Sequence, residues 1–140
     1  MNLTELKTDF ETIINNMSLI KTFVFDDLFS INIDRDKDYP VFLLKPAVTS
    51  RIPKLSDPYE NYDIDFFIFD LFKQDTYKTL SEAWDDLKEQ ADLFVTILYD
   101  NPAKYMIVGE INIERGHFQH NDSLAGVRYQ FELKVFDCRE

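Results

Sequence analysis

The chain has 140 residues and a mass of 16.6 kDa, and we expect a single domain over residues 1–140. An apolar fraction of 45%, with 13 Phe and 7 Tyr, excludes an intrinsically disordered chain. With 26 acidic against 15 basic residues, the formal charge is −11. The average surface therefore repels phosphate, and tight binding of duplex DNA or RNA is not expected.

The sequence carries no sign of membrane insertion or export. No apolar run approaches the roughly 18 residues that span a bilayer, and the start, MNLTELKTDF, lacks the segments of a secretory signal. Cys138 is the sole cysteine and cannot form an internal disulfide. We therefore expect a protein that is cytosolic when it is made and that has no membrane partner.

The first third of the chain predicts one helix and two strands. Apolar residues recur at steps of three and four over 3–20, which predicts a helix. Alternating apolar residues predict a strand over Thr22–Ile33, followed by a polar turn at 34–38. Val41–Leu44 reads as a second strand that ends before Pro46, because proline cannot donate to a sheet ladder.

The next segment is irregular. Three prolines fall within thirteen residues, from Pro46 to Pro58, which predicts a long loop or arm over 46–61. Tyr62–Phe72 follows as the predicted central strand. Its apolar residues lie on both faces, which is typical of a strand that is covered on both sides.

A second helix is predicted over 79–99, where Thr79 and Glu82 have the spacing of a capping box. Its apolar stripe is expected to pack on the central strand, through Phe66 and Ile68 or through Phe67 and Phe69. The residues of this stripe are Trp84, Leu87, Ala91 and Phe94.

Two strands close the chain, Tyr105–Glu114 and Val127–Phe136, and we expect them to pair as a hairpin. Their connection, Gly116–Gly126, is longer than a tight turn. The predicted order is α-β-β-β-α-β-β. The fold class is α+β, with a mostly antiparallel sheet, two helices packed on it and a long arm between the second and third strands.

Two groups of side chains have the residue types of a metal site. His117, His120 and Asp122 offer imidazole and carboxylate ligands, but no fourth ligand is indicated. The acidic run over 34–38 imitates the start of a calcium-binding loop, yet Tyr39 stands where that loop needs glycine. We interpret both groups as polar surface and expect no metal.

No catalytic constellation stands out. The carboxylate pairs Asp63 with Asp65 and Asp85 with Asp86 lack a neighbouring catalytic group. Cys138 lies beside the chain end, where a tuned environment for a reactive thiol is not expected. Three glycines in the whole chain leave no phosphate-binding loop. We therefore expect neither enzymatic activity nor a cofactor.

The predicted arm differs in charge from the rest of the chain. Residues 45–60 carry three basic against two acidic side chains, a net charge of +1, so the remainder carries −12. Apolar side chains are spaced among these charges. The arm is either a segment that docks on a neighbouring acidic subunit or an ordinary surface loop whose apolar residues fold back. The candidate assembly residues are Arg51, Ile52, Lys54, Leu55 and Tyr59.

Three segments together resemble the tail-terminator and tail-completion proteins of bacteriophage necks. They are the two-faced strand YDIDFFIFDLF, the amphipathic helix SEAWDDLKEQADLFVTIL and the final pair INIERGHFQHNDSLAGVRYQFELKVFD. The resemblance rests on the order of elements over essentially the whole chain. It implies a structural virion protein that forms an oligomeric ring at the junction of connector and tail, with no catalytic residues.

The same resemblance implies the partners and the location. Copies of the chain would contact one another and the neighbouring connector and tail proteins in the virion neck, after synthesis in the host cytoplasm. DNA would pass through an acidic lumen without specific binding, because adhesion needs Lys and Arg to neutralise phosphates.

Two alternatives remain open. Class I secretion chaperones are small acidic α+β proteins with a similar order of elements that bind an extended partner segment, but their final helix has no counterpart after the last strand here. The charge of −11 is also compatible with an acidic inhibitor or immunity protein that blocks a basic nuclease.

Overall fold

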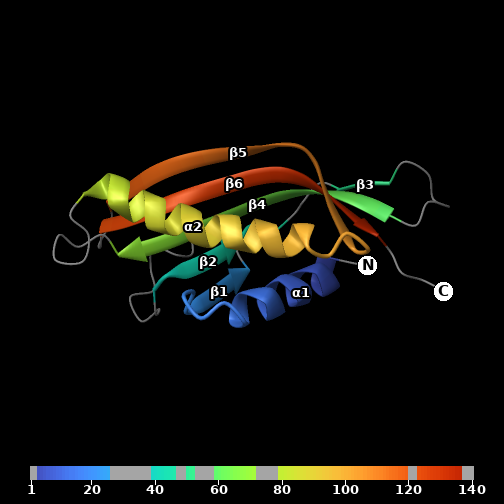
Figure 1. The fold of residues 1–140 in the computed structure, drawn as a ribbon, viewed down its shortest axis with the longest axis horizontal. Helices are drawn as coiled ribbons and strands as arrows, with labels where there is room; N and C mark the ends of the chain where they lie inside the picture. The colour runs from blue at the N-terminus through green and yellow to red at the C-terminus, as the bar shows by residue number, and fades with distance from the viewer. Residues whose placement is uncertain are drawn as a thin grey trace.

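The computed structural model describes residues 3–25, 39–46, 50–52, 59–71, 79–119 and 123–136, which form two helices and a six-stranded sheet (Figure 1). The elements in chain order are α1 (Leu3–Asn15), β1 (Thr22–Phe25), β2 (Val41–Leu44), β3 (Ser50–Arg51), β4 (Tyr59–Leu71), α2 (Leu80–Tyr99), β5 (Tyr105–Gln119) and β6 (Ser123–Phe136).

The sheet has the strand order β1-β2-β4-β6-β5, with β3 paired to β4 off this path. β1 and β2 are parallel, and every other described pair is antiparallel. The predicted α+β class with a mostly antiparallel sheet is therefore confirmed. β4 lies between β2 and β6, which is the central position that its two apolar faces require.

Both helices form close to where the sequence predicts them. α1 ends at Asn15, earlier than predicted, although Met17 and Ile20 beyond its end are still buried. α2 begins directly after Thr79, whose hydroxyl accepts a hydrogen bond from the Glu82 amide at 3.2 Å. This bond satisfies one of the amides that a helix start leaves without a partner.

The predicted order of elements needs a correction in the segment 46–61. Two of its residues, Ser50 and Arg51, form the additional strand β3, and Tyr59 already begins β4. The structure therefore does not confirm one continuous arm, since residues 50–51 and 59–61 of this segment belong to the sheet. The physical reason is the Arg51 side chain, which bonds to carboxylates on two neighbouring strands and holds β3 against β4.

The final hairpin also differs from its prediction. β5 and β6 remain paired as far as Gln119 and Ser123, so the long connection predicted over Gly116–Gly126 is wrong. Gly116 and Gly126 pair directly with each other inside the ladder. The first predicted strand is described only to Phe25, and its continuation with the polar turn at 34–38 lies outside the described residues.

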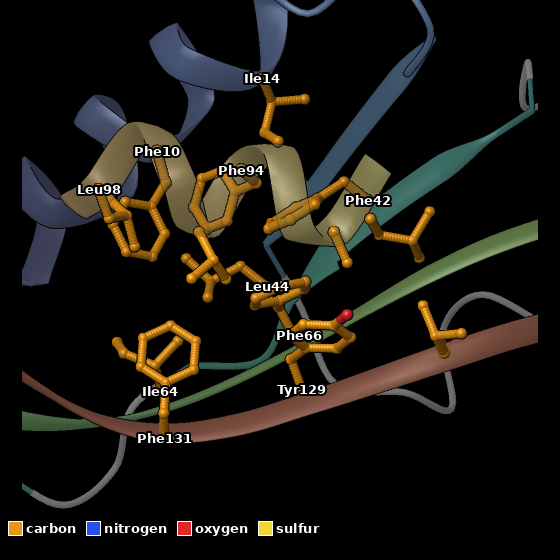
Figure 2. Close-up of a cluster of buried hydrophobic side chains, with 14 of the residues drawn as sticks. Phe10, Ile14, Phe42, Leu44, Ile64, Phe66, Phe94, Leu98, Tyr129 and Phe131 are labelled. Atoms are coloured by element: carbon orange, nitrogen blue, oxygen red, sulfur yellow. The ribbon is translucent and has the colours of Figure 1, made fainter. Parts of the chain in front are cut away.

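One core lies between the helices and the sheet (Figure 2). Figure 2 shows side chains from α1, α2, β2, β4 and β6 converging on it. The α2 stripe meets β4 through Phe66 and Ile68, which decides between the two predicted faces. Leu87, Ala91 and Phe94 are fully buried there, whereas Trp84 is half-buried at the border of the core.

The opposite face of the sheet carries a second, smaller apolar cluster. Val41 and Leu43 of β2 are buried there beside Phe67 and Phe69 of β4. Among the described residues, the partly buried neighbours of this cluster are Val24 of β1, Leu71 of β4 and Tyr39, which lies two residues before β2. The prediction that the central strand is buried on both faces is thus confirmed over this part of β4.

Two tyrosines tie the helices to the sheet. Tyr105 of β5 donates to a carboxylate oxygen of Asp9 in α1 at 2.9 Å, and Lys104 contacts the same carboxylate. Tyr129 of β6 donates to Asp92 of α2 at 2.5 Å. Burial, followed by the bond to a carboxylate, raises the pKa of both phenols above the usual value.

This geometry predicts a loss of stability in alkali. A raised folded-state pKa means that folding keeps both phenols protonated. Their stabilisation is therefore fully present below about pH 10, the unfolded pKa, and is lost as the pH rises above it. We expect the free energy of unfolding, measured in urea, to fall less between about pH 8 and about pH 11 in Tyr105→Phe/Tyr129→Phe than in the wild type. Tyr99→Phe, at an exposed position, is the control and should leave the fall unchanged.

Candidate interaction surface

On the face of the sheet opposite the helices, the surface next to the second apolar cluster is charged. Side chains alternate along β4 and β6, so the neighbours of the core residues point to the opposite face. We call this surface the charged belt, and its residues are Asp63, Asp65, Glu114, Arg128, Gln130 and Glu132.

Arg51 closes one end of the charged belt. Its guanidinium binds both carboxylate oxygens of Asp63, at 3.0 and 2.8 Å, and also contacts Glu132. Asp63 and Glu132 are opposite each other in the β4–β6 register, so their like charges would repel without a cation between them. The arginine therefore fixes β3 and neutralises a pair that the register brings together.

Arg128 makes a similar ion pair at the other end of the charged belt. Its Nε and Nη2 donate to the two carboxylate oxygens of Asp65 at 2.9 and 2.6 Å. Glu114 lies 3.6 Å from Nη1, and the guanidinium lies 5.1 Å from the centre of the Phe67 ring. Arg128 thus joins the charged belt to the second apolar cluster by a bidentate ion pair and a cation–π contact.

A hollow of about 450 Å³ opens in the charged belt. It lies beside the irregularity between Val108 and Asn112, where the β5–β6 register shifts. Gly109 within this bulge has a φ of +74°, a conformation that glycine adopts without strain. The polar side chains lining the hollow are Lys45, Asp63, Asp65, Glu110, Asn112, Gln130 and Glu132.

The electrostatics of the belt suit binding more than proton transfer. The guanidinium of Arg51 holds the pKa of Asp63 below its usual value, so this carboxylate is ionised at neutral pH and is a weak proton acceptor. The bond to Asp65 likewise raises the pKa of Arg128. What the arrangement provides is a set of fixed charges on a rigid sheet.

The five candidate assembly residues occupy different environments. Arg51 bonds within its own chain, and the ring of Tyr59 packs on Phe136 and lies under Lys134. Ile52 is 46% exposed. Lys54 and Leu55 lie outside the described residues. The assembly role of these five residues stays a prediction.

The residues considered for metal binding or catalysis are only partly described. The backbone of His117 belongs to β5, where it pairs with Ala125. His120, Asp122, Cys138 and the run 34–38 lie outside the described residues. Within the described ranges, no three His, Cys, Asp or Glu side chains are grouped as a metal ion requires. Asp63 and Asp65, considered as a carboxylate pair, each bind a different arginine.

Of the helices that the structure describes, neither is long and apolar enough to cross a membrane. The sequence matches no protein-family model, and a search of curated proteins gives no match.

Proposed function

We propose that the protein is a structural subunit that assembles into an oligomeric ring at the connector–tail junction of a bacteriophage. The observation that carries this proposal is that the two edges of the sheet are unlike. One side of the sheet ends in β1 and, farther along β4, in the short strand β3 followed by the exposed Ile52, whereas the other side ends in the long strand β5. A ring needs two different, complementary surfaces on each subunit, whereas a symmetric dimer uses one surface twice.

The charge distribution supports the same role. The first half of α2 exposes a set of carboxylates on the side turned away from the core, and Lys88 is its only cation over this stretch. Such a surface repels phosphate, as a channel that lets DNA pass without adhesion must do. The exposed acidic residues are Glu82, Asp85, Asp86 and Glu89.

Light scattering coupled to size-exclusion chromatography tests the proposal. We expect the purified chain, at its highest soluble concentration, to give a mass several times that of the 16.6 kDa monomer. Negative-stain electron microscopy of that fraction should show closed rings. A stable dimer would contradict the ring and favour a chaperone that binds an extended segment. A monomer at every concentration would contradict it as well and favour an acidic inhibitor.

A further inference from the structure

We propose that the β3 edge of one subunit docks on the β5 edge of the next, at residues 112–115. This inference rests on the proposed ring and names the two surfaces that would form its repeated contact. Both belong to the same sheet at opposite sides, and within the described chain no strand pairs with the outer side of either. A contact between them is head-to-tail, which is the kind that closes into a ring.

The two edges match on the side of the sheet that faces the helices. Arg51 points to the charged belt, so the next residue, Ile52, points to the helix side by the alternation of an extended chain. Ile113 is opposite Tyr129, whose side chain lies in the core, and so it also points to the helix side. Ile113 is only partly buried, so docking would cover apolar surface on both subunits.

On the other side of the sheet the contact would bring Arg51 close to Glu114. Arg51 already binds Asp63 and contacts Glu132, but its side chain is still 47% exposed beside β3. Glu114 is exposed and lies 3.6 Å from Arg128 of its own subunit. Because both groups already have partners, the apolar contact between the isoleucines is expected to contribute most of the binding.

The length of the free stretch of β5 also suits a partner strand as short as β3. The bulge around Gly109 interrupts β5 on one side, and the Trp84 indole donates to the Gly116 carbonyl at 2.9 Å on the other. Features of this kind normally keep an edge strand from pairing at random. They leave a window of a few residues, which suits the two-residue strand β3 and the exposed residue after it.

Disulfide trapping between two single-cysteine variants tests the contact. Both variants carry Cys138→Ser, so that no native thiol reacts; one adds Ile52→Cys and the other Ile113→Cys. After mild oxidation we expect a covalent dimer in the mixture of the two and none in either variant alone. A dimer from one variant alone would show a symmetric contact and overturn the proposal. Leu19→Cys, at a 58% exposed apolar site, replaces Ile52→Cys in the control mixture and should not be trapped.

Substitution of the exposed Ile52 gives a second test that does not depend on thiol chemistry. We expect Ile52→Asp to weaken association about tenfold, as the loss of an interface anchor does, while circular dichroism stays unchanged. Leu19→Asp is the matched control and should associate like the wild type. Two results together would overturn this contact and leave the proposed function standing. They are normal ring formation by Ile52→Asp and no trapped dimer in the mixture of the two cysteine variants. A wild-type chain that never assembles would overturn both.

Discussion

Phe94→Ala is expected to lower the free energy of unfolding by about 3–5 kcal/mol, the usual cost of removing a buried aromatic ring. Phe94 of α2 is fully buried and lies where the two helices and the sheet meet (Figure 2). Its ring centroid lies 5.1 Å from that of Phe10, 5.0 Å from Phe42 and 5.3 Å from Phe66. Truncation therefore removes contacts to α1, β2 and β4 at once and leaves a cavity that those elements cannot all close.

The neighbouring residue supplies the control. Leu93 is 47% exposed, so Leu93→Ala should change the free energy of unfolding by no more than about 0.5 kcal/mol. Urea unfolding of the two variants, followed by far-ultraviolet circular dichroism, measures the difference. Equal losses would mean that α2 is not held on the sheet by the face that carries Phe94.

The helices could be predicted because their signals are local. The capping residue Thr79 and an apolar residue at every third or fourth position predict α2 with its start and end displaced by at most one residue. α1 was predicted too long, since Met17 and Ile20 continue the apolar pattern after the helix has ended. A buried side chain and a helical backbone are separate properties, and periodicity reports the first.

Strand β3 could not be predicted, because a contact distant in sequence creates it. Arg51 reaches Asp63, twelve residues on, and Glu132, which belongs to another strand. The sequence around Arg51 is rich in proline, which favours a loop. The ion pairs overrule this local preference, and Ser50 and Arg51 join the sheet.

The charged belt was only half visible in the sequence. Asp63 and Asp65 alternate with apolar residues, and so do Arg128 and Glu132, so each strand shows a polar face. Which carboxylate meets which arginine depends on the β4–β6 register, and no local pattern specifies it. The hollow could not be foreseen for the same reason, since it lies beside a bulge.

The predicted connection between β5 and β6 is too long. Gly116 and Gly126 bound the connection that the sequence predicts, but they pair with each other within the ladder. Glycine weakens a strand unless something approaches the backbone closely. At Gly126 that something is Phe69, its partner in the register, whose ring lies over the backbone of β6.

Gly126→Ala is therefore expected to lower the free energy of unfolding by about 1–3 kcal/mol, the cost of overpacking a core. An added Cβ would lie 2.7 Å from Cδ1 and 2.8 Å from Cε1 of the Phe69 ring. Phe69 is 1% exposed and stacks on Phe67 with ring centroids 5.4 Å apart, so its ring cannot move aside without breaking the second apolar cluster. Urea unfolding measures the loss.

A double-mutant cycle with Phe69→Leu identifies the cause of this loss. Leucine removes the ring atoms that an alanine at 126 would meet. The double variant should therefore be destabilised by less than the sum of the two single changes. Gly109→Ala is the matched control, because a Cβ there meets nothing within 4 Å and its cost comes from a φ of +74°. That cost, about 1 kcal/mol, should add to the effect of Phe69→Leu without coupling. If the losses of Gly126→Ala and Phe69→Leu also add, a steric clash with the Phe69 ring is contradicted. Phe69 would then not be the reason why position 126 carries no side chain.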